Sequence, residues 1–234
     1  YTALDCITFF QGHPKKQIDL LIKDTLKFID VCIEKSSFED TSANVLNKLE
    51  SLKKAGYKNT ILSHEKFSLR YHNVIASCKA LATSKPLTVP VGICHGDLTF
   101  SNILVSNLGH TSEYQKTILI DFLDSFVETP MQDMVKLRQD TVYYWSSYLY
   151  SQEIDSSRLD TVFRYIDKKI HNHFIKYSFY TEHYKLFQTI NLLRVLCYCK
   201  NEHIASFLLE CTEELINGKF NNTSGRKIFA VPRC

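Results

Sequence analysis

The chain of 234 residues is long enough for one large domain or two small ones. Its hydrophobic fraction of 44% and charged fraction of 23% are ordinary for a soluble globular protein, and no apolar run approaches the roughly 18 residues that a membrane span needs. The net charge of +3 is not gathered into a basic stripe, which argues against nucleic acid as the main partner.

The first residues contain neither a basic n-region nor an initiator Met, so we see no signal peptide and expect a chain that begins inside a longer one. The eight cysteines are dispersed along the sequence and form no pair of C-x2-C motifs. We therefore expect reduced, mostly buried thiols and a cytoplasmic protein.

The N-terminal part begins with a β-type run, Tyr1–Phe10, which predicts a strand that ends at a turn signal. From Lys16 to Lys35 the apolar residues recur at steps of three and four, which predicts one helix that faces a core. An N-cap at residues 40–42 predicts a second helix, with Gly56 as its C′ residue.

A third, less regular helical stretch covers about Thr60–Leu81. Two short strands, 103–105 and 117–120, follow it and are joined by a polar loop as a hairpin. After Pro130 the pattern is helical, and the tail is a loop with room for one short strand at 228–231. The sequence predicts a mainly helical α+β fold, with C-terminal helices near 131–150, 156–177, 181–200 and 202–217.

The strongest functional signal joins a polar loop, 94–105, to an apolar segment that ends on an aspartate, 118–124. Phosphoryl transfer from a nucleotide needs a carboxylate to accept the proton of the acceptor hydroxyl, and an Asn and an Asp to hold magnesium on the phosphates. Asp97, Asn102 and Asp121 are these residue types in this order. The D-x4-N spacing also matches the catalytic loop of kinases.

Three motifs resemble those of the aminoglycoside phosphotransferase and choline kinase family, which is related to protein kinases. Residues 95–102 resemble its H-G-D-x4-N loop, 120–122 its I-D-F segment, and 130–133 the P-x-x-D that follows. The resemblance covers about Tyr1–Leu149.

This resemblance implies the C-terminal lobe of a protein-kinase-like fold, with a small β-hairpin at the active site. Residues 1–14 would be the last strand of the small lobe and the hinge, and 15–234 the helical large lobe. Since no Gly-rich loop or strand lysine precedes Tyr1, we expect either a fragment of a longer enzyme or an incomplete kinase.

The resemblance also implies roles for single residues. Asp97 would be the catalytic base or the carboxylate that orients the acceptor hydroxyl. Asn102 and Asp121 would bind Mg²⁺, a cation suited to amide and carboxylate oxygens. His95 would hold the loop, Asp133 would tie the following helix to the loop backbone, and Asp124 would support the metal site.

Two further groups are assigned, the first from the resemblance and the second from its position just beyond Asp133. The backbone of Thr8, Phe9 and Phe10 would meet the nucleotide base. Arg138 and Asp140 are possible acceptor contacts, although an exposed helix face explains them equally well.

We thus expect a small-molecule kinase that transfers the γ-phosphoryl of ATP or GTP, with Mg²⁺, to a hydroxyl of a sugar, amino alcohol or aminoglycoside-like acceptor. One alternative is a non-catalytic kinase-like binding module, and another is a metal-dependent phosphohydrolase. The sequence leaves open the acceptor, the choice between ATP and GTP, and the oligomeric state.

Overall fold

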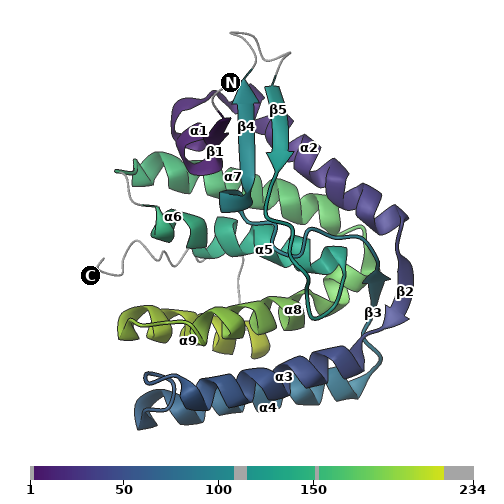
Figure 1. Cartoon of the computed structure of the whole chain (residues 1–234), viewed down its shortest axis with the longest axis vertical. Helices are drawn as coiled ribbons and strands as arrows, with labels where there is room; N and C mark the ends of the chain where they lie inside the picture. The colour runs from purple at the N-terminus through teal and green to yellow at the C-terminus, as the bar shows by residue number, and fades with distance from the viewer. Residues whose placement is uncertain (1–2, 108–114, 151–152, 219–234) are drawn as a thin grey trace. The chain divides into compact units, whose positions relative to one another are not determined.

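A computed structural model describes residues 3–107, 115–150 and 153–218. It is a mainly helical α+β structure with small sheets, as the sequence predicts (Figure 1). The predicted strand at 228–231 and most of the predicted hairpin loop lie outside the described residues.

The chain forms two compact units, each built from two stretches of sequence. Unit 1 combines Tyr1–Ser37 with Pro90–Tyr177, and unit 2 combines Phe38–Val89 with Ser178–Cys234. All residues that the sequence assigns to catalysis, metal binding or nucleotide binding belong to unit 1.

Unit 1 contains a three-stranded antiparallel sheet in the order β1-β4-β5 (Figure 1). The predicted hairpin is confirmed, since β4 (Ile103–Asn107) pairs with β5 (Gln115–Leu119). On its other side β4 pairs with β1 (Ala3–Asp5), so that Leu4 lies opposite Val105.

The predicted N-terminal strand is wrong beyond β1, because helix α1 occupies Cys6–Gly12. Asp5 is the N-cap of α1 and accepts a hydrogen bond from the backbone N–H of Thr8 at 2.9 Å. Phe9 and Phe10 are fully buried on this helix. Their aromatic character favours a strand locally, but the cap and the spacing of the buried residues favour a helix.

The described residues of unit 1 also form the helices α2, α5, α6 and α7. Helix α2 (Lys15–Glu34) buries the predicted apolar stripe. The predicted helix 131–150 is divided into α5 (Pro130–Tyr143) and α6 (Trp145–Leu149) because Tyr144 adopts a left-handed conformation, with φ of 61°. Helix α7 (Ser156–Phe174) follows, close to its predicted bounds.

The described residues of unit 2 form four helices: α3 (Ser42–Lys58), α4 (Glu65–Ser84), α8 (Ser178–Leu196) and α9 (Glu202–Ile216). The chain first leaves unit 1 within the short strand β2 (Ser37–Asp40) and returns to it within β3 (Thr88–Val91); these strands were not predicted and form a two-stranded sheet. It enters unit 2 again between α7 and α8, after Tyr177.

Gly56 was predicted to be the C′ residue of the second helix, but it lies inside α3. A Cβ atom at Gly56 would lie 2.3 Å from the ring of Tyr71 on α4, so the glycine allows the two helices to approach closely. The Tyr71 hydroxyl is buried against α3 and donates a hydrogen bond to the carbonyl of Leu52 at 2.9 Å.

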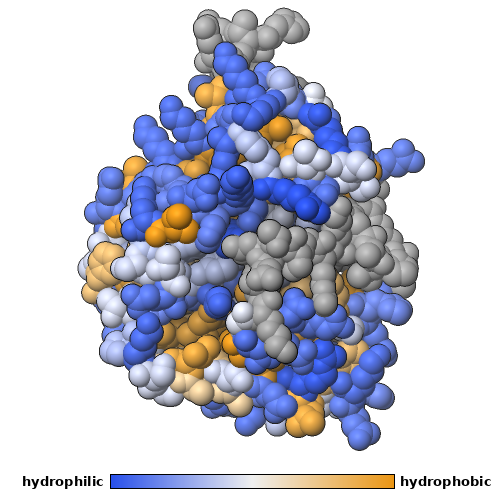
Figure 2. Space-filling view, turned by 180° about the vertical axis from the view of Figure 1, so that it is seen from behind, coloured by the Kyte–Doolittle hydropathy of each residue, from blue (hydrophilic) through white to orange (hydrophobic). Residues whose placement is uncertain are grey.

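Hydrophilic side chains cover most of the face shown in Figure 2, and hydrophobic ones interrupt it in separate patches. No helix among the described residues has the length and apolar character that a membrane crossing requires.

Candidate active site

The loop that carries His95 and Gly96 is fixed by a buried carboxylate at the start of α5. Asp133 accepts hydrogen bonds from the backbone N–H of His95 at 2.8 Å and of Gly96 at 2.9 Å. Thr129 caps this helix and Pro130 occupies its first turn, which places Asp133 one turn from the helix N-terminus. Asp133 thus joins α5 to the backbone of the loop.

The buried position of Asp133 has a measurable consequence for stability. Burial raises the pKa of Asp133 to about 7, although the two hydrogen bonds from backbone N–H groups act in the opposite direction. The folded protein therefore holds a proton here over a pH range in which the unfolded chain has lost it. The stability that this proton contributes is complete below the ordinary carboxyl pKa and is lost as the pH rises to about 7.

We expect the free energy of unfolding of the wild type, relative to that of Asp133→Asn, to fall as the pH rises. The decrease should approach about 1.4 kcal/mol per pH unit between about pH 5 and 7. Urea unfolding of both proteins across this range measures the difference. A difference that does not change with pH would contradict the assignment.

The segment 118–124 lies directly against the loop 94–105. The backbone N–H of Leu123 donates to the carbonyl of His95 at 3.0 Å. Gly96 adopts a φ of 79°, and a Cβ atom there would lie 1.9 Å from the carbonyl oxygen of Leu123. Only a glycine satisfies both the backbone conformation and this close approach.

Gly96→Ala is therefore expected to lower the free energy of unfolding by about 1–3 kcal/mol. Alanine is strained in the left-handed conformation, and its Cβ atom would displace the carbonyl of Leu123. Gly12→Ala is the matched control, because nothing lies within 4 Å of a Cβ atom at Gly12, the last residue of α1. Urea unfolding of the two variants tests this, and an equal effect of both would show that Gly96 is not constrained.

Asp97 is held by two partners. The Lys136 Nζ atom lies 2.7 Å from Asp97 Oδ1, and the Lys136 side chain is 3% exposed. Asn102 Nδ2 donates to the backbone carbonyl of Asp97 at 2.8 Å and to Oδ2 at 3.1 Å. The Asp97 side chain is still 22% exposed, so its carboxylate is oriented and accessible to a ligand.

Asn102 and Asp121 offer oxygen atoms for a metal ion. Since the Asn102 NH₂ group faces Asp97, its carbonyl oxygen is directed elsewhere. The backbone N–H of Ile120 donates to the backbone carbonyl of Asn102 at 3.0 Å. This contact brings the residue before Asp121 to the loop that carries Asp97. Asp121 itself has a φ of 58°, a strained value for a non-glycine residue that is often found at functional sites.

The donor set fits magnesium. The Asp121 carboxylate is exposed, and within the described residues no hydrogen bond or ion pair engages it. Mg²⁺ is commonly held by one or two protein oxygens together with water and substrate phosphates. The described part of the chain has no group of three His, Cys, Asp or Glu side chains suited to a metal ion, so a fully protein-made metal cage is not formed there.

The side chain of His95 is buried and packs inside the loop 94–105. Its ring is buried, stacks on Phe122 with centroids 4.3 Å apart, and accepts the backbone N–H of Asp97 at Nδ1. Burial lowers the pKa of His95, so the ring is neutral near pH 7. Asp124, the other predicted supporting residue, is exposed and has no hydrogen bond or ion pair within the described residues.

The predicted acceptor contacts are corrected, because Arg138 and Asp140 are buried within unit 1. Arg138 forms a two-point ion pair with Asp167 on α7, at 2.8 and 2.9 Å. Asp140 accepts hydrogen bonds from the backbone N–H of Phe100 and from Ser146. Both residues therefore support the loop and the helix packing instead of meeting a ligand.

The predicted nucleotide contacts are also corrected. The backbone N–H of Thr8 donates to the helix cap, and the carbonyl of Phe9 accepts from the backbone N–H of His13 at 3.0 Å. The carbonyl of Phe10 accepts from Arg158 Nε at 2.9 Å. One backbone group of each of these residues is thus engaged, and all three lie in helix α1 instead of at the end of a strand.

Lys136, which contacts Asp97, is the residue of this candidate site that sequence reasoning missed. It lies one turn after Asp133 and one turn before Asp140, so the three charged residues share a face of α5 at helical spacing. All three are buried. Charged residues at steps of three and four on a helix that follows a catalytic motif are the signal that identifies such a face.

Comparison with known proteins identifies the family of this chain. The model of the ecdysteroid kinase-like family matches residues 18–137, just over half of the chain, which includes Asp97, Asn102, Asp121, Asp133 and Lys136. No curated protein and no solved structure matches the chain. The expected kinase-like relationship is thus confirmed, whereas the specific resemblance to aminoglycoside phosphotransferases and choline kinases is not. The chain belongs to the ecdysteroid kinase-like family.

Proposed function

We propose that this chain carries the phosphoryl-transfer site of a small-molecule kinase. Asp97 orients the acceptor hydroxyl and takes its proton, while the hydroxyl oxygen forms a bond to the γ-phosphorus of ATP or GTP and the bond to the nucleoside diphosphate breaks. Asn102 and Asp121 would hold Mg²⁺, which neutralises charge on the phosphates when it is bound.

The orientation of the Asn102 amide is the observation that carries this proposal. One side chain binds Asp97 through its NH₂ group and keeps its carbonyl oxygen for a cation. This links the position of the base to that of the metal. The exposed carboxylate of Asp121, whose strained backbone directly follows the backbone contact between Ile120 and Asn102, supplies the second oxygen donor.

Lys136 is a positioning residue in this proposal. Its ammonium group compensates the charge of Asp97 from the buried side, and it fixes Oδ1 at 2.7 Å. Asp97 Oδ2 is hydrogen-bonded to Asn102 at 3.1 Å, a long contact that an acceptor hydroxyl can share.

The acceptor is an alcohol on a small molecule. Sugars, amino alcohols and aminoglycosides are consistent with the resemblance in the motifs, and the family name adds ecdysteroids to this set. Asp97 would engage a hydroxyl, a group that all these acceptors share.

Transfer of labelled γ-phosphate by the full-length protein tests the proposal. The protein is incubated with Mg²⁺ and labelled ATP or GTP, together with sugars, amino alcohols, aminoglycosides and ecdysteroids. Label should move to at least one acceptor and should require both Mg²⁺ and Asp97. Nucleotide binding without transfer would instead identify a non-catalytic module, and acceptor-independent release of phosphate would identify a hydrolase.

A further inference from the structure

Helix α5 contacts the loop 94–105 at three points that follow one another in the same order along the helix and along the loop. Asp133 accepts the backbone N–H groups of residues 95 and 96, Lys136 pairs with Asp97, and Asp140 accepts the backbone N–H of Phe100. The three helical residues are buried and lie three and four positions apart, so they share one face of α5. The loop therefore follows this face for about two helical turns, or roughly 10 Å.

Asp140 is fully buried and accepts three hydrogen bonds. One comes from the backbone N–H of Phe100, and the backbone N–H and hydroxyl of Ser146 donate the other two, both at 2.8 Å. Burial raises the pKa of Asp140 to about 6, although the three hydrogen bonds and the charge of Lys136 act in the opposite direction. A buried carboxylate with three donors is held in one orientation, so it fixes the amide of Phe100 to α5 and to α6.

Phe100 is the first residue of a single 3₁₀ turn, Phe100–Asn102, whose last residue is the proposed magnesium ligand. The backbone N–H of Asn102 donates to the carbonyl of Thr99 at 3.0 Å, which closes this turn. The Asn102 side chain extends back to Asp97, as described above. Because the turn is only three residues long, a rotation of the peptide group at Phe100 would displace Asn102. The bond from Phe100 to Asp140 opposes this rotation.

We propose that Asp140 is a positioning residue for Asn102. By fixing the amide of Phe100, it keeps the carbonyl oxygen of the Asn102 side chain where that oxygen can bind Mg²⁺. This inference rests on the proposed function, because it takes Asn102 as a ligand of the metal. Residues that support a metal ligand from outside the metal site commonly set its orientation and the affinity for the metal.

Asp167 provides a matched control on the opposite side of α5. Its carboxylate also accepts three hydrogen bonds, two from Arg138 and one from the hydroxyl of Thr141. Arg138 lies two positions from Lys136 and two from Asp140, which places it about 200° around the helix from each of them. Asp167→Asn should therefore weaken the packing of α5 on α7 without releasing the loop.

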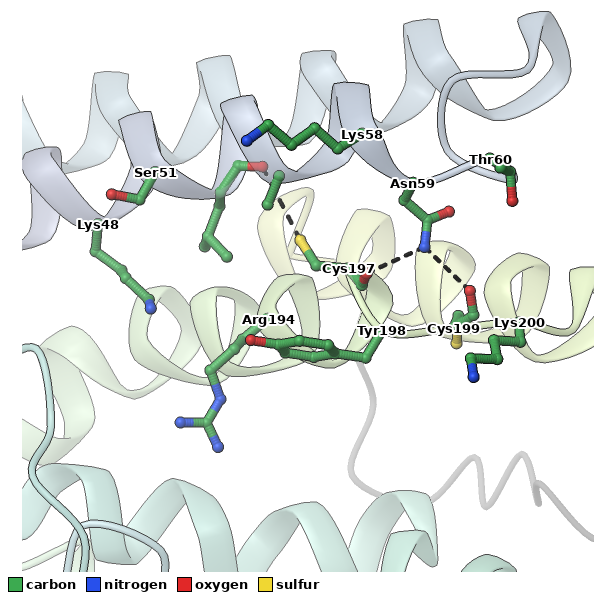
Figure 3. A pocket seen from close by; sticks show the side chains of 12 residues that line it. Lys48, Ser51, Lys58, Asn59, Thr60, Arg194, Cys197, Tyr198, Cys199 and Lys200 are labelled. Atoms are coloured by element: carbon green, nitrogen blue, oxygen red, sulfur yellow. Dashed lines mark hydrogen bonds between the residues drawn. The ribbon is translucent and has the colours of Figure 1, made fainter.

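A second control lies in unit 2, where the side chain of Asn59 also joins two backbone segments (Figure 3). Asn59 Nδ2 donates to the backbone carbonyls of Cys197 and Cys199, both at 3.0 Å, and Oδ1 accepts the backbone N–H of Ile61 at 2.9 Å. Asn59→Ala removes these hydrogen bonds from a unit that does not contain the loop. It should lower the free energy of unfolding and leave the position of Asn102 unchanged.

Hydrogen exchange of the full-length protein, measured without nucleotide and without Mg²⁺, tests the contact between Asp140 and the loop. Peptides that cover residues 98–104 should exchange faster in Asp140→Asn than in the wild type. The asparagine amide has one acceptor oxygen, and its NH₂ group would face donors, so it cannot accept the three hydrogen bonds of the carboxylate. Asp167→Asn and Asn59→Ala should exchange as the wild type does over these residues.

The magnesium dependence of nucleotide binding measures the consequence for Asn102. With ATP, and with GTP in parallel, the Mg²⁺ concentration that gives half-maximal binding should rise about 10–100-fold in Asp140→Asn. Ser146→Ala removes one of the three donors and should raise it about threefold to tenfold. Ser146→Ala replaces Asp140→Asn in both measurements if the latter does not fold. The two control variants should keep the wild-type value.

The proposal is overturned if residues 98–104 exchange equally in the wild type and in Asp140→Asn, or if their exchange rises while the required Mg²⁺ concentration does not. It is also overturned if Asp167→Asn changes the Mg²⁺ requirement as much as Asp140→Asn does, because that result would indicate a general loosening of α5. Failure of the proposed function is a different outcome. A wild type whose nucleotide binding does not depend on Mg²⁺ would refute the metal site itself, whereas the exchange measurement requires neither ligand.

Discussion

Replacement of Asp97 by Asn is expected to lower the turnover of phosphoryl transfer by about 10²–10⁴-fold, the contribution typical of a positioned general base. Asparagine retains the size of the side chain, and its carbonyl oxygen can still accept a hydrogen bond from Lys136. The amide, however, cannot take the proton of an acceptor hydroxyl. The measurement is kcat with saturating nucleotide and the acceptor found in the screen.

The ion pair with Lys136 requires a control for this variant. Since Lys136 is 3% exposed and lies 2.7 Å from Asp97 Oδ1, the neutral amide removes the negative charge of this contact from a buried ammonium group. Breaking a buried pair in this way costs up to about 3–5 kcal/mol of stability. A loss of activity in Asp97→Asn alone would therefore combine chemistry with stability.

The double variant Asp97→Asn, Lys136→Met separates the two effects. It removes both charges, so the free energy of unfolding measured with urea should recover relative to Asp97→Asn. Turnover should remain about 10²–10⁴-fold below that of the wild type, because the base is still absent. Recovery of turnover together with stability would show that Asp97 acts through the structure of the loop and not as a base.

Elements determined by local sequence were predicted well. Helix α2 buries one regular stripe of apolar residues, and the β4–β5 hairpin joins two apolar runs through a polar loop. Both patterns depend on neighbours within a few positions in the chain. The order of Asp97, Asn102 and Asp121 was readable for the same reason, since each belongs to a short motif.

Features determined by distant packing were not predicted. Arg138 and Asp140 have the residue types of an exposed helix face, yet α5 is buried on nearly all sides and pairs them with Asp167 and the catalytic loop. Gly56 has the local appearance of a helix end, but it is needed for the approach of Tyr71 from another helix. A single sequence does not contain the identity of such partners.

Replacement of Asp121 by Asn is expected to weaken magnesium-dependent nucleotide binding by more than about 100-fold. Altering a residue that only supports a metal ligand typically lowers metal affinity about 10–100-fold, and Asp121 is proposed to bind the metal directly. Asn adopts the left-handed conformation more readily than most residues, so the backbone at φ of 58° should be preserved. Alanine at this position would add about 1–2 kcal/mol of backbone strain, so that loss of the carboxylate and loss of stability would both affect the Kd. The measurement is the nucleotide Kd with Mg²⁺ and with EDTA.

Asp124→Asn provides the matched control for Asp121→Asn. Asp124 is exposed on the same segment, and its replacement removes the same charge. If Asp121 binds the metal, Asp121→Asn abolishes the difference between the Kd values with Mg²⁺ and with EDTA, whereas Asp124→Asn preserves most of it. Equal losses in the two variants would indicate a general effect of negative charge near the phosphates. An unchanged Kd in Asp121→Asn would refute the metal assignment and leave Asn102 without its proposed partner.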